Sequence, residues 1–414
     1  RLVREAHAAR APIEQLADRL SARIVPAVVA VSGLTFAAWL LLGGDNGLSM
    51  GIVSAVSVLV IACPCGLGLA TPLSMTVAIG RGAQSGILVR SSAAMQALAV
   101  ADVVLFDKTG TLTRGQPQLV DAGSIAPHQD VDAMLRLAAA VEAASEHPLA
   151  HAFTHAAELR GFAIPAAERV RAVVGRGVTG IAEGRQVDVG NAGFMQERVG
   201  LESPPAEAEA ARHRGATVVY AALDGRTAAW FAIEDRPRDE AASVIASVLQ
   251  RGLQPALLSG DTQAAADHLG TLVGLEDVRG GCNPSDKLRD IHRRHQEGHR
   301  IAFVGDGIND APALAAADVG IAVGSAADVA IETADITLLS GGLTRLPTAI
   351  DLARQTMRNV RENLALSLVY NLLAIPIAAG LLYPVTGMLM SPMLAAAAMT
   401  ASSLSVIGNA MRLR

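Results

Sequence analysis

Four long apolar segments without any charged residue constrain the fold of this 414-residue chain more than any other feature. They cover residues 24–42, 50–79, 364–383 and 392–411. A helix needs about 20 apolar residues to cross a bilayer, and each segment is close to that length or longer. Because 51% of the residues are hydrophobic and the mean hydropathy is +0.36, the chain is also too apolar for an ordinary soluble enzyme of this size. We therefore predict four transmembrane helices, two at each end of the chain.

The second apolar segment contains two prolines, and the first of them, Pro64, separates Cys63 from Cys65. On a regular helix these two cysteine side chains would point apart, but a proline breaks the helical hydrogen-bond ladder and lets both sulfurs face one cavity. Isolated buried cysteines usually act as small hydrophobic residues. A pair of cysteines around a proline inside a membrane helix favours a metal site instead.

The ligand types indicate which metal such a site would hold. Soft thiolates favour Cu(I), whereas a divalent ion such as Zn²⁺ would more often recruit a harder partner, and the four segments contain no carboxylate. The other polar candidates are Tyr370 and Asn371 in the third segment and Met399 and Ser403 in the fourth. Met399 and Ser403 share one helical face at i and i+4. For the fourth segment alone, helix packing through small residues is an equally good explanation.

Arginine residues lie near only one end of each apolar segment. They are Arg19, Arg23, Arg81, Arg90, Arg354, Arg358, Arg361, Arg412 and Arg414. The short loops over residues 43–49 and 383–391 contain neither lysine nor arginine. The positive-inside rule therefore predicts that both termini and the large middle region are cytoplasmic.

The middle region, residues 85–346, alternates short apolar runs with helical patterns, which is typical of an α/β fold. The candidate strands cover residues 101–106, 255–258, 301–304, 319–323 and 336–339. Between residues 117 and 234 the pattern changes to a helix over 130–160 and short β-like runs over 170–191, so we predict an inserted α+β domain there. The predicted domains are 1–84 (lead-in and two spans), 85–117 and 234–346 (two parts of the α/β domain), 118–233 (insertion) and 347–414 (two spans).

Asp107 lies just beyond the apolar run 103–106, at the predicted carboxyl end of a strand. Chemistry gathers at such ends of open α/β sheets, because loop amides and helix N-termini converge there on anions. The residues that follow, Lys108, Thr109 and Gly110, add a cation, a hydroxyl group and a flexible loop that can surround a phosphate. A lone Asp-x-Thr-Gly is most often a turn. The full order Asp-Lys-Thr-Gly-Thr-Leu-Thr indicates a carboxylate nucleophile instead.

Three further loops at predicted strand ends carry matching chemistry. They contribute Ser259, Gly260 and Asp261, then Lys287, and then Asp306, Asn309 and Asp310. Each loop alone is more often a turn or a solvated charge. Phosphoryl transfer needs positioning and neutralised charge, which a hydroxyl, an ammonium group and a Mg²⁺ ion held by carboxylates supply. The four loops together therefore predict a phosphoryl-transfer site.

The order of these four loops resembles the haloacid-dehalogenase-type core of the P-type ATPases. The resemblance implies that Asp107 is the phosphorylated nucleophile and that Lys287 contacts the phosphoryl oxygens. It also implies catalytic roles for Lys108, Thr109, Ser259, Gly260, Asp261, Asn309 and Asp310, and Mg²⁺ binding by Asp107, Asp306, Asp310 and the Thr109 carbonyl. The family usually has threonine where this chain has Ser259, so we expect looser positioning there.

The insertion contains Gly175, Gly177 and Gly180 in a G-x-G-x-x-G pattern. A dinucleotide fingerprint would open a helix after a strand, whereas residues 178–189 alternate like a β-hairpin. The surrounding residues instead resemble the ATP-binding domain of heavy-metal P-type ATPases. The resemblance implies nucleotide binding by Glu142, Ser145, Glu146, His147, Gly175, Gly177, Gly190 and Asn191. A metal site on His147, His151 and His155 is a weaker alternative, because no carboxylate or cysteine completes it.

The Cys-Pro-Cys, Tyr-Asn and Met-x-x-Ser-Ser patterns resemble the Cu(I)-transporting branch of this family. The resemblance implies export of Cu(I), and of the related ion Ag(I), driven by ATP and Mg²⁺ through a phosphoaspartate. It further implies a multi-pass protein of the plasma (inner) membrane that receives Cu(I) from a copper chaperone. A net charge of −5 without blocks of like charge gives no sign of nucleic-acid binding.

The resemblance begins just after the family's actuator domain. The sequence has no Thr-Gly-Glu motif and no N-terminal Cys-x-x-Cys domain, and half of the family's usual spans are missing. We therefore expect a C-terminal portion that needs the missing N-terminal part of the same protein to complete its cycle. Three alternatives stay open: a Zn²⁺- or Cd²⁺-transporting ATPase, a soluble phosphatase or phosphotransferase of the same core fold, and a non-catalytic binding or assembly subunit.

Overall fold

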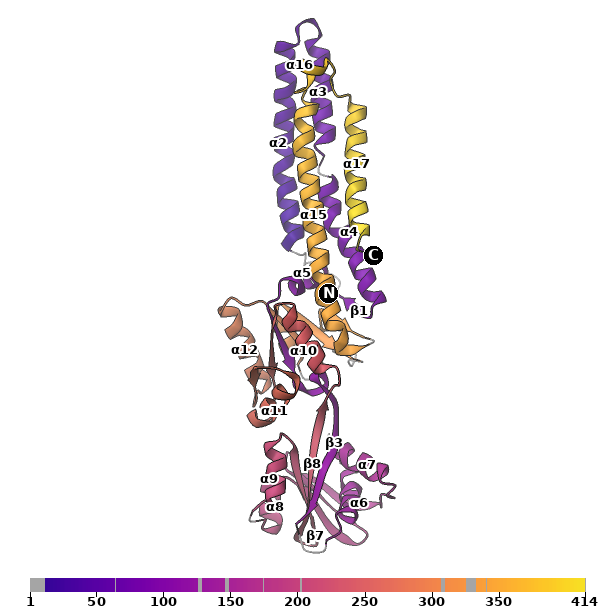
Figure 1. Ribbon diagram of the computed structural model, residues 1–414, viewed down its shortest axis with the longest axis vertical. Coiled ribbons are helices and arrows are strands. Elements are labelled where there is room, and N and C mark those ends of the chain that lie inside the picture. Colours follow the sequence, from indigo (N-terminus) through magenta and orange to yellow (C-terminus); the bar gives the residue numbers. More distant parts are fainter. Residues whose placement is uncertain are drawn as a thin grey trace. The chain divides into compact units, whose positions relative to one another are not determined.

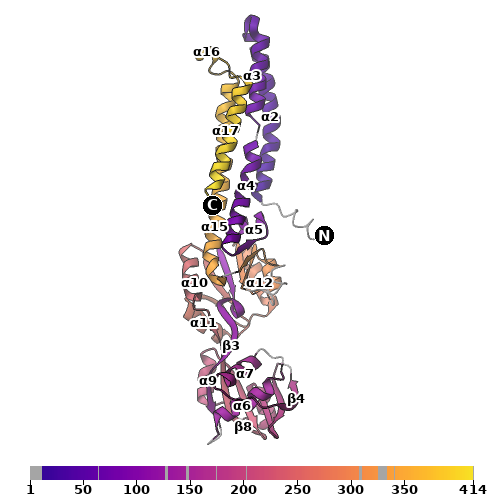
Figure 2. The same cartoon turned by 90° about the vertical axis from the view of Figure 1, so that its right-hand side faces the viewer.

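The computed structural model describes residues 12–63, 65–125, 129–145, 149–173, 175–201, 203–306, 310–324, 333–339 and 341–413 (Figures 1 and 2). The chain divides into two compact units, which are described separately below. The first contains the residues up to Ala101 and those from Asp335 onward, and the second is Asp102–Ala334.

The first unit is built from long helices that pack along one another (Figure 2). They are α2 (Pro12–Leu42), α3 (Gly47–Ile61), α4 (Cys65–Gln84), α15 (Leu346–Ala378) and α17 (Pro392–Met411). Helices α2 and α3 approach closely because glycines face the contact: a β-carbon on Gly47 would lie 2.7 Å from the carbonyl oxygen of Trp39. The short elements are η1 (Gly44–Asn46), β1 (Ile87–Val89), α5 (Ser92–Val100), β13 (Ile336–Leu338), η3 (Gly342–Arg345) and α16 (Tyr383–Thr386), with β1 and β13 antiparallel.

Three helical stretches of the described part are long and apolar enough to cross a membrane: Ala22–Leu42, Gly44–Ile61 and Pro392–Met411. The predicted second span is two helices, because α3 ends at Ile61 and α4 begins only at Cys65. The break falls where the sequence predicts it, although Pro64 itself lies outside the described residues. The predicted third span over 364–383 is not among these three stretches, and it stays a prediction. Its helix, α15, ends at Ala378, so the charge-free part after Glu362 is shorter than the roughly 20 residues required.

The second unit contains a parallel sheet whose strands run in the order β12-β11-β2-β9-β10. These strands are β2 (Val103–Asp107), β9 (Gln254–Leu258), β10 (Asp277–Arg279), β11 (Ile301–Gly305) and β12 (Val319–Val323). Its helices are α10 (Ala241–Gln250), α11 (Gln263–Val273), α12 (Pro284–Gln296) and α13 (Ala311–Ala316). The predicted strands near 103, 255, 301, 319 and 336 are all confirmed as strands, since each is a buried apolar run. Asp107 ends the central strand, with β11 on one side and β9 on the other.

A second, antiparallel sheet lies between β2 and β9 in the chain, in the order β3-β8-β7-β6-β5-β4. The strands are β3 (Thr113–Ser124), β4 (Ala167–Val173), β5 (Gly177–Ala182), β6 (Arg185–Gly190), β7 (Thr217–Leu223) and β8 (Arg226–Pro237). Its helices are α6 (Val131–Glu142), α7 (Ala150–Leu159), α8 (Ala192–Val199) and α9 (Ala206–His213). Helices α6 and α7 form one apolar cluster with the sheet, and α8 and α9 form a second one.

Two sequence predictions about this sheet have different outcomes. The hairpin over 178–189 is confirmed, since β5 and β6 pair and turn at Glu183 and Gly184, both with positive φ. The single helix over 130–160 is wrong, because α6 ends at Glu142 and α7 begins at Ala150. The apolar periodicity continues through both helices and hides the interruption between them.

Candidate active site

The carboxyl end of β2 brings one lysine and two aspartates into contact. The Nζ atom of Lys287 lies 2.5 Å from Oδ1 of Asp107 and 2.6 Å from Oδ1 of Asp310. Lys287 projects from the first turn of α12, and Asp310 immediately precedes α13. All three side chains are buried, so these ion pairs are little screened by water. The structure therefore joins residues that the sequence places 180 positions apart.

The charges at this centre do not balance. Burial and then the nearby Asp310 raise the pKa of Asp107 to about 7, and Lys287 opposes both. Burial works to lower the pKa of Lys287, but the two carboxylates outweigh it and raise that pKa. Oδ2 of Asp310 is buried and has no hydrogen-bond partner among the described residues. One ammonium group cannot neutralise two buried carboxylates, and one carboxylate oxygen has no partner in the described part of the chain. A second cation bound here would balance the charge and satisfy that oxygen.

The turn after Asp107, η2 (Lys108–Leu112), brings a further carboxylate to the site. Gly110 has φ of +73°, and a β-carbon there would lie 3.1 Å from Oδ2 of Asp306. Only glycine combines this backbone conformation with such a close approach. Asp306 follows β11, so its carboxylate lies against the turn beside the end of β2. Carboxylates of this kind suit Mg²⁺, and Asp306, Asp310 and Asp107 are the residues that would hold it.

The Ser259–Asp261 loop borders the same turn. Ser259 is buried, and its Oγ accepts the N–H of Asp261 at 3.1 Å. Asp261 forms an ion pair with Lys108. Asp261 and Asp306 thus approach η2 from two loops, and Thr109 is exposed. Asn309 lies outside the described residues.

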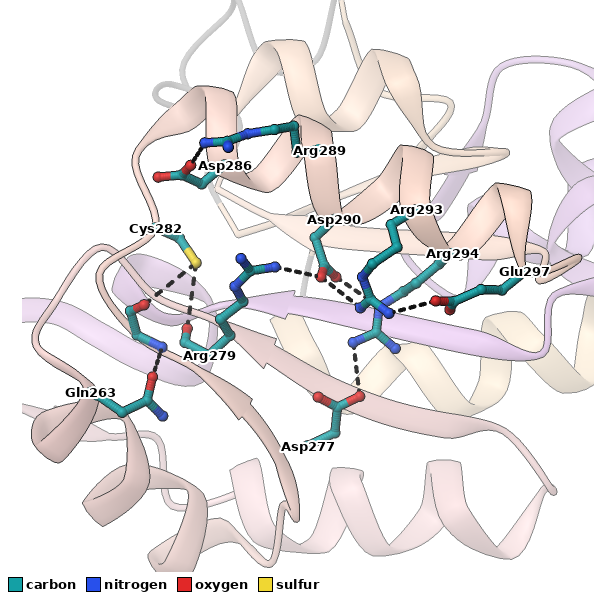
Figure 3. Close-up of polar contacts among 11 residues, drawn as sticks. Gln263, Asp277, Arg279, Cys282, Asp286, Arg289, Asp290, Arg293, Arg294 and Glu297 are labelled. Atoms are coloured by element: carbon teal, nitrogen blue, oxygen red, sulfur yellow. Dashed lines mark hydrogen bonds and ion pairs between the residues drawn. The ribbon is translucent and has the colours of Figure 1, made fainter.

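Helix α12 is held in place by a cluster of charges that sequence reasoning missed (Figure 3). Asp290, one turn after Lys287, is buried and accepts from Arg279 at 3.0 Å, Arg293 at 2.8 Å and Arg294 at 2.7 Å. The Arg279 carbonyl also accepts the N–H of Ser259 at 2.8 Å. Arg279 therefore connects the serine loop to the helix that carries the lysine. The spacing of Asp290 to Arg293 and Arg294, at i+3 and i+4, is the signal that could have identified part of it.

The residues proposed for nucleotide binding occupy the other sheet and its helices. Glu142 ends α6, is buried, and has a pKa raised to about 7 by burial alone. Its Oε2 has no hydrogen-bond partner among the described residues. The N–H of Ser145 donates to the Glu142 carbonyl at 2.7 Å. An unpartnered buried carboxyl group is what a hydrogen-bonding ligand would satisfy, while Glu146 and His147 lie outside the described residues.

The glycines of this region have packing reasons of their own. Gly177 pairs with Gly190 in the β5–β6 register, and a β-carbon on Gly177 would lie 2.3 Å from the Val189 carbonyl oxygen. Asn191 caps α8 by accepting the Phe194 N–H at 2.9 Å, and it donates to the Gly175 carbonyl at 3.2 Å. These residues therefore fix a tight turn that leads into β5, and their contact with a nucleotide stays a prediction.

The metal-ligand candidates lie on helices of the first unit. Cys63 is half-buried in the break between α3 and α4. Tyr370 and Asn371 lie on α15, Met399 and Ser403 on α17, and these two helices pack against each other and against α3. The Cys65 side chain lies outside the described part. A shared site for these candidates stays a prediction.

Comparison with known proteins relates these observations to a family. Residues 101–318 match haloacid dehalogenase-like hydrolases. The chain is 45% identical to a copper-exporting P-type ATPase of Legionella pneumophila, over 100% of this chain and 56% of the relative. It is 44% identical to a silver exporting P-type ATPase of Salmonella typhimurium, over 100% of this chain and 50% of the relative. The chain spans about half the length of the curated relatives it matches.

Solved structures agree with this relationship. The chain is similar to a zinc-transporting PIB-type ATPase in the E2.Pi state, with a TM-score of 0.81 and 35% identity over 100% of this chain and 66% of the other. The catalytic domain of the CPx-ATPase CopB-B matches 67% of this chain and 98% of its own length, with a TM-score of 0.54 and 27% identity. The chain belongs to the haloacid dehalogenase-like hydrolases and, within them, to the heavy-metal P-type ATPases.

Proposed function

We propose that this chain transfers the γ-phosphoryl group of ATP to Asp107 and uses the resulting phosphoaspartate to drive export of Cu(I), with Ag(I) as a related cargo. The observation that carries the proposal is the buried carboxylate at the end of β2, 2.5 Å from the Lys287 ammonium group and beside Asp310. Burial and Asp310 raise the pKa of this carboxyl group to about 7, and such strongly shifted carboxyl groups are typical of functional sites.

The phosphoryl transfer follows from the positions of these groups. An oxygen of ionised Asp107 attacks the γ-phosphorus, the bond to the bridging oxygen breaks, and ADP leaves with the electron pair. Lys287 favours the ionised form of Asp107, in opposition to burial and Asp310, and would neutralise charge on the phosphoryl oxygens. Mg²⁺ bound by Asp306 and its neighbours would supply further positive charge there. Glu142, buried and partnerless at one oxygen, would contact the adenine edge.

The proposed cargo rests on ligand chemistry. Cys63 lies in a break between apolar helices, and the apolar segments contain no carboxylate. Two thiolates match a soft monovalent ion. Relatives named for copper and silver export support the same choice. We extend the proposal to a multi-pass protein of the plasma membrane that receives Cu(I) from a chaperone.

A zinc transporter is the second candidate, because the solved structure with a TM-score of 0.81 is a zinc-transporting ATPase. One experiment separates the two. Reduced protein in detergent receives radiolabelled ATP with Cu(I), Ag(I) or Zn²⁺, and the acid-stable phosphoenzyme is measured. We expect a hydroxylamine-sensitive phosphoenzyme with Cu(I) and Ag(I), and none in Asp107→Asn. Stimulation by Zn²⁺ alone would favour the second candidate, and label that persists in Asp107→Asn would refute the phosphoaspartate.

A further inference from the structure

The two sheets of the second unit are joined by paired strands. The chain leaves the parallel sheet through η2 and β3 and returns along β8, and these long strands run side by side (Figure 1). Thr113 at the start of β3 is in register with Pro237 at the end of β8. The residue after Pro237 is therefore delivered directly to the turn that follows Asp107.

That residue, Arg238, donates hydrogen bonds to three consecutive carbonyl groups of this segment. Its Nε lies 2.9 Å from the Thr111 oxygen, a terminal guanidinium nitrogen lies 2.8 Å from the Gly110 oxygen, and its backbone N lies 2.8 Å from the Leu112 oxygen. Thr109 and Gly110 have non-helical backbone angles, so the turn does not stabilise itself as a regular helix would. The planar guanidinium group matches two adjacent acceptors, which a lysine ammonium group cannot do.

Asp235, three residues earlier on β8, supports the same segment. Its carboxylate accepts from the Thr113 hydroxyl group and, at 3.2 Å, from the N–H of Gln116. The Thr113 oxygen in turn accepts the Gly110 N–H at 3.3 Å. Two side chains at the end of β8 thus hold η2. Arg238 binds its carbonyl groups, and Asp235 acts on its Gly110 amide group through Thr113. By contrast, Arg236 between them is exposed.

We propose that Arg238 is a positioning residue, supported by Asp235, that holds the turn after Asp107 in its reactive shape and links that shape to the strand that returns from the nucleotide-binding sheet. Arg238 does not contact the reacting atoms. It acts through Gly110, whose backbone lies against Asp306, the proposed Mg²⁺ ligand. The inference rests on the proposed function, because it concerns the same phosphoryl transfer.

The proposal predicts that substitution of Arg238 slows phosphoryl transfer but leaves nucleotide binding almost unchanged. With Arg238→Ala, the carbonyls of Gly110 and Thr111 lose their donors and the turn can shift relative to Asp306. We expect phosphoenzyme formation at saturating ATP to slow by about 10- to 100-fold, since small misplacements near a reacting centre have effects of this size. The Mg²⁺ concentration for half-maximal rate should rise. Nucleotide affinity should change less than about twofold, because Glu142 and its surroundings are untouched.

The test uses the full chain in detergent, with rapid-quench phosphorylation, nucleotide binding and thermal unfolding measured for each variant. Arg236→Ala is the matched control on the same strand and should behave like the unsubstituted chain. Arg238→Lys should recover part of the rate, and added guanidinium ion at millimolar concentration should rescue Arg238→Ala. If Arg238→Ala fails to fold, Arg238→Lys and Arg238→Gln carry the test through the same Mg²⁺ dependence.

Three outcomes would overturn the inference: an unchanged rate in Arg238→Ala, an equal loss in Arg236→Ala, or a loss of rate matched by an equal loss of nucleotide affinity. Failure of the proposed function itself has a different signature. In that case the unsubstituted chain forms no Asp107-dependent phosphoenzyme, and both proposals fall together.

Discussion

At Asp107 the fold places a carboxyl group where its charge is unfavourable. Burial and Asp310 raise its pKa from 3.8 to about 7. Between those two pH values the folded chain binds more protons than the unfolded chain, so the contribution of Asp107 to stability falls as pH rises. A residue that only stabilised the fold would not be held this way. The same shift determines when the group can act as a nucleophile.

We predict a pH dependence from this pKa. At low Mg²⁺ concentration, phosphoenzyme formation should rise with pH through about 7, because the protonated Asp107 cannot attack phosphorus. Saturating Mg²⁺ should move the midpoint to lower pH, since a bound cation stabilises the carboxylate. Rapid-quench rates across a pH series at two Mg²⁺ concentrations measure both effects.

Two variants assign that titration to its residue. Asp310→Asn removes one cause of the shift and should lower the midpoint. Glu142 also has a pKa of about 7, so Glu142→Gln at saturating ATP is the necessary control and should leave the midpoint in place. If the midpoint disappeared in Glu142→Gln and did not change in Asp310→Asn, the pH dependence would belong to Glu142, and its assignment to Asp107 would be wrong.

Among the helices and strands, the sequence predicts those that a short stretch of residues determines by itself. Strands β2, β9, β11 and β12 can be predicted because each is an apolar run with polar residues at its carboxyl end. The break between α6 and α7 cannot, because apolar periodicity continues across it. The contacts of Arg238 with Thr111 cannot either, because they join residues 127 positions apart. Pairing of β3 with β8 creates that contact, and no spacing in the sequence encodes it.

Helices α4, α15 and α17 are joined by a buried cluster of amide and hydroxyl groups. Ser74 donates to Asn359 Oδ1 at 2.8 Å, and Asn363 donates to the Ser74 oxygen at 3.1 Å. Asn409 donates to Asn363 Oδ1 at 3.0 Å. Among apolar helices, such interhelical hydrogen bonds replace the hydrophobic effect as a source of specific association. This cluster fixes the three helices in one register.

We predict that Asn363→Leu destabilises the helical unit by about 1–3 kcal/mol, because it removes a donor to buried Ser74 on α4 and an acceptor for half-buried Asn409 on α17. Denaturation in detergent measures the change. Thr400→Val is the matched control on α17: Thr400 is exposed, and among the described residues its hydroxyl group donates only to the Ala396 carbonyl oxygen of its own helix, at 3.0 Å. It should change stability by less than about 0.5 kcal/mol. Equal effects of the two substitutions would show that the cluster does not join the helices.

At the scale of the molecule, the chain is nested. The unit Asp102–Ala334 is inserted between two halves of the helical unit, and the six-stranded sheet is inserted between β2 and β9 of the parallel sheet. Each inserted part is therefore connected to its host by two chain crossings. The strands β3 and β8 are the two chain connections between the six-stranded sheet and the parallel sheet that carries Asp107. The proposed metal ligands and Asp107 belong to different units.

The nesting predicts that metal sensing and phosphoryl chemistry can be separated by substitution. In reduced protein, Cys63→Ala should abolish stimulation of phosphoenzyme formation by Cu(I), because it removes a proposed thiolate ligand in the helical unit. Phosphorylation of Asp107 by inorganic phosphate should persist, since the groups around Asp107 all belong to the other unit. Both reactions are measured by acid-stable label on the same preparation.

Cys282→Ala is the matched control, because Cys282 is a buried free cysteine in the unit that contains Asp107. It removes a thiol without touching the apolar helices and should leave Cu(I) stimulation intact. If Cu(I) still activates Cys63→Ala, the metal acts elsewhere in the chain. If Cys63→Ala also loses phosphorylation by inorganic phosphate, the break between α3 and α4 supports the catalytic unit structurally, and its role as a separate sensing site is wrong.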